Sequence, residues 1–413
     1  MQPNTIFWII VSIIVLDMML ERWLAWKNQQ SLKNPIPAEL EGLYGEEKYR
    51  KMMDYNAEKA RFSAITSVFS FVLIMLLLFL GGFAWLDSEV RLISDNAIIQ
   101  VLLYFAALAI TSDILGMPFS LYNTFVIEEK YGFNRTSVKT FILDKIKGYL
   151  LGALIGGGLT ALIVWIYINT GEYFWLWAWS VVTFFTLFMT AFYSSVILPM
   201  FNKLTKLEDG ELRDELTALC KKVGFKLNDL FIMDGSKRSS KANAFFSGLG
   251  SSKRIVLFDT LVENHDTDEL VGVLAHEIGH YKLKHTLVST VLSILQTGLM
   301  LFVLSLLIDS PALSAALGVA EPSFHIGIIA FGMLYSPLST VISLLMNKLS
   351  RTNEYAADAY AREVFKAEPL ITALKKMSVD HLSNLTPDPT YVFFHYSHPP
   401  LLQRLRALAS SSK

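Results

Sequence analysis

Residues 268–285 read DELVGVLAHEIGHYKLKH, and this stretch decides how the rest of the chain is interpreted. Its apolar residues recur at helical spacing, which predicts a helix with Asp266 or Thr267 as its N-cap. His276 and His280 are four residues apart and fall on one helical face, where two imidazoles can bind one metal ion. Because H-E-x-x-H is short enough to arise by chance in a long chain, other segments must support a metal site.

A hydrolytic zinc site needs a third protein ligand and one open position for water. The longer signature H-E-x-x-H-x-x-G-x-x-H is absent, because Leu283 and Thr286 stand where it has Gly and His. His285 comes one position too early for that signature. We interpret it as part of a basic segment at the membrane surface rather than as a ligand.

A second candidate ligand lies in residues 350–364, SRTNEYAADAYAREV, where Glu354 and Asp358 share one helical face. Near the metal, Glu354 could ligate it, while Asp358 could accept a hydrogen bond from the far ring nitrogen of a ligand histidine. The alternative is a solvated acidic face with Arg351 and Arg362 as partners. Spacing alone does not decide between the two interpretations.

Two further positions could take part in catalysis. Glu277, between the two histidines, could take a proton from water and pass it to a leaving amine. Residues 393–405, FFHYSHPPLLQRL, contain His395 and His398, one of which could donate to the oxyanion of a tetrahedral intermediate. A turn or surface histidine is the alternative for this pair.

The composition indicates a membrane protein, since only 18% of the 413 residues are charged and 53% are hydrophobic, whereas soluble domains have about 25% charged residues. The first apolar segment could be a signal peptide, but no basic residue precedes it and Asp17, Glu21 and Arg22 interrupt it. Hydropathy predicts seven transmembrane helices, which run approximately from Ile6 to Trp26, Ile65 to Leu86, Ala97 to Pro118, Tyr149 to Asn169, Tyr173 to Leu198, Thr286 to Ile308 and His325 to Met346.

Basic residues predict the orientation of these helices. The loops after the first and third helices are rich in Lys and Arg, so we expect them in the cytoplasm, with the N-terminus outside and the C-terminus inside. Residues 199–285 then lie on the cytoplasmic side. We expect Asp17, Glu21 and Asp113, in or near apolar spans, to face the protein interior or to form interhelical hydrogen bonds.

The polar part of the chain predicts a small domain. Residues 209–224 look like an amphipathic helix, and the runs DLFIMDG, NAFFSG and RIVLFDT predict a small antiparallel sheet. Cys220 is the only cysteine, which excludes an intrachain disulfide and a cysteine zinc cluster, and no basic patch indicates nucleic acid. We divide the chain into a membrane region (1–198), a first protease segment (199–285), further membrane helices (286–346) and a second protease segment (347–413).

Five segments together, in this order, resemble the CAAX prenyl protease 1 family of integral-membrane zinc metalloproteases. They are EEKYGFNRTS, SKANAFFSG, HEIGH, SRTNEYAAD and SHPPLLQRL. HEIGH alone is common to many proteases, but the ensemble is specific and covers nearly the whole chain. The resemblance implies a mainly α, polytopic fold in which seven transmembrane helices enclose an intramembrane chamber. It also implies that a zinc protease domain with a small β-sheet caps this chamber on the cytoplasmic side.

The resemblance also implies roles for single residues. His276, His280 and Glu354 would bind one Zn²⁺, and Glu277 would be the general base and acid. His398 would assist at the transition state, Asp358 and Arg404 would support the site, and Asn243 would lie on the edge strand that aligns the substrate.

These observations predict a membrane-embedded zinc endopeptidase that cleaves peptide or protein substrates, lipidated or not, at the cytoplasmic face of the bilayer. The ending ALASSSK has no endoplasmic reticulum retention signal, so we expect a bacterial inner membrane rather than that compartment. One alternative is a quality-control protease with no requirement for a prenyl group. Another is a transporter with a structural zinc domain, which is disfavoured because structural zinc sites fill all four positions with protein ligands.

Overall fold

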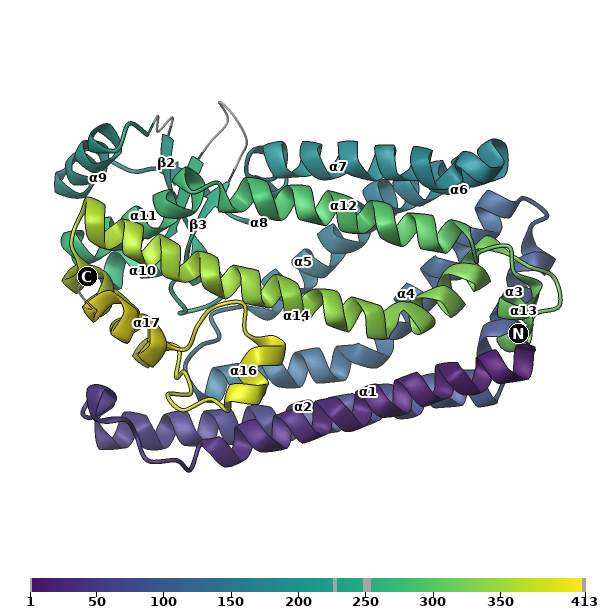
Figure 1. The fold of residues 1–413 in the computed structure, drawn as a ribbon, viewed down its shortest axis with the longest axis horizontal. Coiled ribbons are helices and arrows are strands. Elements are labelled where there is room, and N and C mark those ends of the chain that lie inside the picture. The colour runs from purple at the N-terminus through teal and green to yellow at the C-terminus, as the bar shows by residue number, and fades with distance from the viewer. Residues whose placement is uncertain (1, 226–228, 248–253, 411–413) are drawn as a thin grey trace.

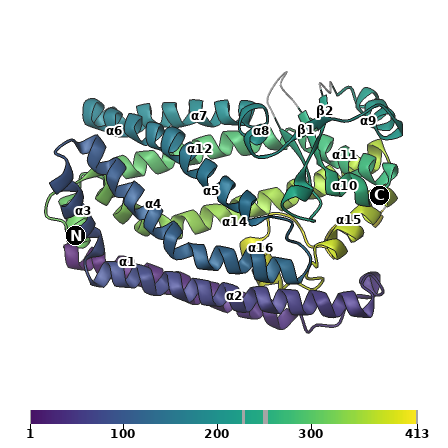
Figure 2. The ribbon, with the colours of Figure 1, turned by 180° about the vertical axis from the view of Figure 1, so that it is seen from behind.

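The computed structural model describes residues 2–225, 229–247 and 254–410, and within them the chain is mostly helical with one small sheet (Figures 1 and 2). Gly248, the last residue of NAFFSG, and the tail residues 411–413 lie outside this description. The helices are α1 (Pro3–Ser31), α2 (Glu46–Phe79), α3 (Gly82–Ile93), α4 (Ala97–Tyr122), α5 (Val138–Leu151), α6 (Gly158–Thr170), α7 (Phe174–Val196), α8 (Leu198–Phe201), α9 (Glu211–Lys222), α10 (Asp259–Asn264), α11 (Thr267–Lys282), α12 (His285–Ser305), α13 (Pro311–Ala316), α14 (Phe324–Val364), α15 (Ala367–Asp380), α16 (Pro389–His395) and α17 (Leu401–Ala409).

Six helical runs in the described residues are long and apolar enough to cross a membrane, which confirms the prediction of a mainly α, polytopic membrane protein. The fourth run, Val138–Phe201, contains two of the seven predicted spans, because the chain reverses at Gly171 and α6 packs back against α7. The predicted end of the second span at Leu86 is wrong. Helix α2 ends at Phe79, since Gly81 adopts a left-handed conformation with φ of 69° and α3 begins after it.

The long helices run side by side, and the small mixed domain lies at the end of the molecule opposite the N-terminus (Figure 1). Helices α1 and α2 lie along one side, α7 and α12 along the other, and the 41-residue helix α14 runs between them (Figures 1 and 2). Helix α14 continues from the bundle into the small domain, where it packs against α11. One helix thus connects the membrane region to the predicted metal site.

The sheet contains strands β1 (Leu204–Lys206), β2 (Asp229–Met233), β3 (Ala244–Ser247) and β4 (Arg254–Phe258) in the order β1-β2-β4-β3. The three predicted strands are present, but the prediction of an antiparallel sheet is wrong. After β2 the chain passes to the outer position and returns, so β4 lies between β2 and β3 and runs parallel to β2. The central position of β4 explains its continuous apolar run, of which Ile255, Val256 and Leu257 are buried.

Helix α11 begins with a capping box, in which Asp266 accepts from the backbone N–H of Glu269 and the Glu269 side chain accepts from the backbone N–H of Asp266. The helix is buried on nearly all sides between α9, α14 and α15. It packs closely against α14 at Gly279, where a Cβ atom would lie 3.2 Å from the backbone Cα and O of Ala357. The absence of a side chain at Gly279 therefore sets the distance between α11 and α14.

We predict that Gly279→Leu destabilises the protein by about 1–3 kcal/mol, because the added side chain would force α11 away from the backbone of α14. Thermal unfolding in detergent should show a lower Tm for this variant. Gly116→Leu, at a helical glycine whose added Cβ meets nothing within 4 Å, is the matched control and should unfold near the wild-type temperature. Equal Tm values for the Gly279 variant and the wild type would contradict this account of the packing.

Candidate metal centre

The structure brings His276, His280 and Glu354 together at the contact between α11 and α14. The Nε2 atoms of His276 and His280 are 3.1 Å apart. The carboxylate of Glu354 lies 3.5 Å from Nε2 of His276 and 3.2 Å from Nε2 of His280. Among the described residues, this is the only group of three or more His, Cys, Asp or Glu side chains close enough to share a metal ion.

These three residues fit a zinc ion. Bonds of about 2.0–2.1 Å in a tetrahedral site place neighbouring ligand atoms about 3.3–3.4 Å apart, which is close to the separations found here. Glu354 is only 3% exposed, and within the described residues its Oε2 accepts no hydrogen bond. Nη1 of Arg404 lies 3.4 Å from this oxygen and lessens the cost of burying it, and a metal ion would be a second cation beside it. The chemistry of the donor set, two imidazoles and one carboxylate, is that of catalytic zinc sites.

Asp358 and Arg404 form the layer behind the three candidate ligands. Asp358 accepts from Nδ1 of His276 at 2.8 Å, which leaves Nε2 of that ring free to bind a metal. Arg404, from α17, donates to both carboxylate oxygens of Asp358, at 2.8 and 2.6 Å. Burial lowers the pKa of His276, but hydrogen bonds to Asp358 and Glu354 outweigh it and raise that pKa to about 9. The surrounding carboxylates therefore create a field that favours positive charge at this ring.

Glu277 faces a cavity of about 300 Å³ that contains the three candidate ligands. Burial raises the pKa of its carboxyl, and the neighbouring imidazoles of His276 and His280 act in the opposite direction. Glu277 forms no ion pair or hydrogen bond with other described residues, so its carboxylate is available to exchange protons with a bound molecule. A carboxylate in this position is suited to general acid–base chemistry.

The structure separates the two C-terminal histidines. His398 lines the cavity of the metal centre, with Nε2 3.3 Å from Glu354, and Ser397 lies 3.0 Å from its other ring nitrogen. His395 instead turns toward α1, where its Nε2 lies 3.4 Å from Glu21. Of the pair, His398 is therefore the one that can reach a molecule held at the metal centre.

Asn243 lines the same cavity and immediately precedes β3, the outer strand of the described sheet. Its carbonyl accepts from the backbone N–H of Phe258 in β4, which fixes this backbone beside the cavity. An outer strand next to a metal centre can add an extended peptide as a further strand. All the residues predicted for the site thus lie in or directly behind one cavity.

Comparisons with known proteins agree with this arrangement. Residues 25–203 match the family described as CAAX prenyl protease N-terminal, five membrane helices, and residues 206–412 match Peptidase family M48. The chain is a member of the CAAX prenyl protease 1 family. It is thus a membrane metallopeptidase of family M48, as the sequence motifs predicted.

Relatives of this M48 peptidase cover nearly its full length. The CAAX prenyl protease 1 homolog of Oryza sativa subsp. japonica is 36% identical, over 97% of this chain and 96% of its own. The CAAX prenyl protease 1 of Saccharomyces cerevisiae is 35% identical, over 98% and 96%. The crystal structure of S. mikatae Ste24p superposes with a TM-score of 0.93 and 33% identity, and covers 98% of this chain and 99% of that one.

One contact in this M48 peptidase was missed by the sequence analysis. His285 is not part of the candidate ligand group, but its Nδ1 lies 3.1 Å from Nδ1 of His280. If Nε2 of His280 binds the metal, Nδ1 of that ring carries a proton and can donate it to His285. Lys284, with φ of 62°, turns the chain between α11 and α12 and so directs His285 back toward His280. Nothing in the local sequence signals this turn.

We predict that Arg404→Met lowers the free energy of unfolding by about 3–5 kcal/mol, because it leaves the buried carboxylate of Asp358 without its cation. Thermal unfolding in detergent measures this effect. The matched control on the same helix is Arg406→Met, since Arg406 pairs with Glu39 at an exposed position, where solvent screens the pair, and its loss should shift the Tm far less. A similarly small decrease in Tm for both variants would show that the ion pair of Arg404 with Asp358 does not stabilise the site.

We predict that His285→Ala weakens zinc binding about 10- to 100-fold, because it removes the acceptor that orients the ring of His280. Competition with a chromogenic chelator measures the affinity without reference to activity. His285→Asn places an amide oxygen near the former Nδ1 and should retain more of the affinity than His285→Ala. Wild-type affinity in the alanine variant would exclude this role.

Proposed function

We propose that the chain holds one Zn²⁺ with His276, His280 and Glu354 and cleaves peptide bonds with Glu277 as its general base. The observation that carries this proposal is the convergence of these four side chains on one cavity at the contact of α11 and α14. Membership of a metallopeptidase family supports the same conclusion. The transporter alternative with a structural zinc domain has no comparable support.

Each proposed step uses a side chain of the cavity. A bound zinc ion supplies a Lewis acid that polarises the substrate carbonyl and makes water acidic enough to ionise near pH 7. Glu277 takes a proton from the attacking water and later delivers it to the leaving amine. His398, which is largely exposed to the cavity, donates a hydrogen bond to the oxygen that becomes negative in the tetrahedral intermediate. Asp358 and Arg404 keep His276 in the required tautomer.

The backbone beside Asn243 supports a proposal for substrate alignment. An extended peptide would pair with the outer strand β3 and present its scissile carbonyl to the metal centre. The names of the relatives describe proteases of prenylated CAAX proteins, and we propose a lipidated C-terminal peptide as the first substrate class to test. A quality-control protease that accepts unlipidated peptides is the second candidate, because nothing in the metal centre requires a lipid.

We propose that the metal centre faces the cytoplasm, with the N-terminus on the opposite side, as the distribution of basic residues indicates. The relatives named above are eukaryotic, so they do not support the expectation of a bacterial membrane. The membrane compartment stays a prediction.

We predict that Glu277→Gln reduces kcat about 10²- to 10⁴-fold and leaves about one zinc ion bound per chain, because Gln cannot accept the proton from water. Metal analysis and cleavage of a farnesylated CAAX peptide by the purified protein in detergent measure both quantities. Removal of zinc with a chelator should abolish cleavage in the wild type, and added zinc should restore it.

The same assay with an unprenylated peptide separates the two substrate classes. Cleavage of the farnesylated peptide alone would support a prenyl protease, and equal cleavage of both would support a general membrane protease. Full activity in the zinc-containing Glu277→Gln variant would refute the proposed mechanism.

A further inference from the structure

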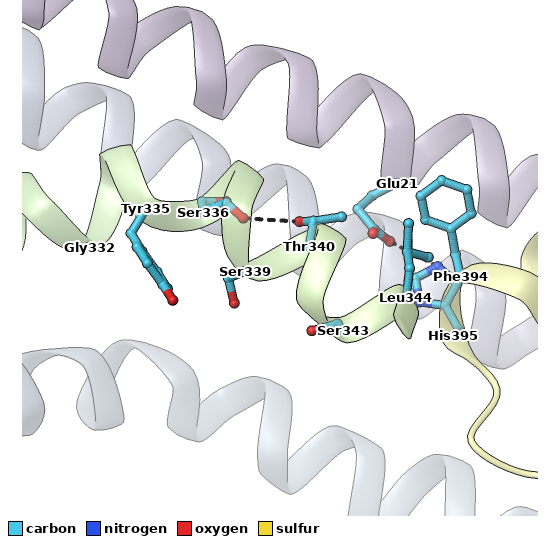
Figure 3. A pocket seen from close by; sticks show the side chains of 10 residues that line it. All are labelled: Glu21, Gly332, Tyr335, Ser336, Ser339, Thr340, Ser343, Leu344, Phe394 and His395. Carbon is cyan, nitrogen blue, oxygen red and sulfur yellow. Dashed lines mark hydrogen bonds and ion pairs between the residues drawn. The ribbon is translucent and has the colours of Figure 1, made fainter. Parts of the chain in front are cut away.

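A second cavity, of about 420 Å³, lies between α1, α14 and α16, within the segments that are apolar enough to span the membrane. Its wall on α14 carries polar side chains at helical spacing, and Glu21 of α1 lies beside His395 at one end of the cavity (Figure 3). We call this space the hydroxyl cavity. Its lining residues are Glu21, Gly332, Tyr335, Ser336, Ser339, Thr340, Ser343, Leu344, Phe394 and His395.

Glu21 is the one carboxylate among the residues that line the hydroxyl cavity, and none of these residues is Lys or Arg. No described lining residue is basic other than His395, whose Nε2 lies 3.4 Å from the carboxylate of Glu21 (Figure 3). One turn away on α1, Asp17 accepts a hydrogen bond of 2.6 Å from Ser336 and forms no ion pair with another described residue. Within the described residues these two carboxylates have a histidine and a serine as partners, so a cationic group that entered the cavity would add a favourable ion pair.

The structure disfavours a metal ion as that cation. Asp17, Glu21 and His395 do not converge closely enough to form a metal-binding group among the described residues. The hydroxyl groups of the α14 wall and the buried, unpartnered hydroxyl of Tyr335 offer hydrogen-bond acceptors spread over the length of the cavity. An ammonium or guanidinium group on a flexible side chain can use several such acceptors at once.

The hydroxyl cavity is connected to the metal centre through α16 and the loop that follows it. His395 lines the hydroxyl cavity and His398, three residues later, lines the metal centre. Asn347 donates to the carbonyl of Phe394 and Arg351 to that of Tyr396, which fixes this segment on α14. Between Ser343 and Glu354 the helix rises about 16 Å. An extended peptide covers this distance with about five residues.

We propose that the hydroxyl cavity is a substrate subsite that binds a Lys or Arg side chain about five residues away from the cleaved peptide bond. The proposal rests on the function proposed above and adds a substrate preference to it. The carboxylate of Glu21 pairs with the cationic side chain, and Ser339 and Ser343 accept its remaining hydrogen bonds. The side chain of Glu21 is half exposed in the cavity, so its carboxylate is accessible to such a group.

The test compares two fluorogenic peptides that differ only in Lys or norleucine at a position five residues from the cleaved bond, on either side of it. We expect the wild type to prefer the Lys peptide, and Glu21→Gln to lower the ratio of the two kcat/KM values about tenfold. Glu21→Lys should reverse the preference toward a peptide with Glu at that position. Glu321→Gln removes an exposed carboxylate that pairs with Arg91, and it should leave the ratio unchanged.

Binding of the same peptides to the full-length Glu277→Gln protein, measured by fluorescence anisotropy, gives an independent result. The subsite is supported if the Lys peptide has the lower Kd and this difference disappears when Glu21→Gln is added. This holds even if the wild type cleaves neither peptide. Absence of cleavage would refute only the proposed chemistry. A kcat/KM ratio and a Kd ratio that do not change with Glu21→Gln overturn the subsite, whatever the catalytic result.

Discussion

The contact between α11 and α14 at Gly279 and Ala357 is the constraint on which the metal centre depends. A Cβ at position 279 would lie 3.2 Å from the backbone of Ala357, so glycine allows the two helices to approach a few tenths of an ångström closer than a residue with a side chain would. The close approach brings Glu354 within reach of the two histidines, and the pair of Asp358 with Arg404 then neutralises buried charge behind them. Helix packing therefore determines the chemistry, because separated helices would leave three unpaired polar side chains in a buried site.

Helix periodicity and the H-E-x-x-H spacing were sufficient to predict the parts of the site that lie on one helix. The Asp266 cap, the shared face of His276 and His280 and the position of Glu277 all follow from a single local pattern. The apolar runs predicted the membrane helices equally well, because their length is a local property. Glu354 could only be suggested from its spacing to Asp358, since nothing in the sequence shows which helix it meets.

Features that depend on distant parts of the chain could not be predicted. The bond between Arg404 and Asp358 requires α17 to fold back on α14, and the contact of His285 with His280 depends on the turn at Lys284. The direction of β4 depends on which strand pairs with which, whereas the composition of a strand only indicates that it is one. His395 and His398 look alike in the sequence, yet the turn of α16 sends them into different cavities.

The continuity of α14 has a consequence for the order in which the protein is made. The two histidines leave the ribosome well before Glu354, and Arg404 follows 50 residues after Glu354. The ligand set is incomplete until α14 is synthesised, and its charges are not balanced until α17 has packed behind it. During membrane insertion the nascent chain therefore lacks the assembled cluster of His276, His280 and Glu354 until α14 has been made, and the support from Arg404 comes only after α17.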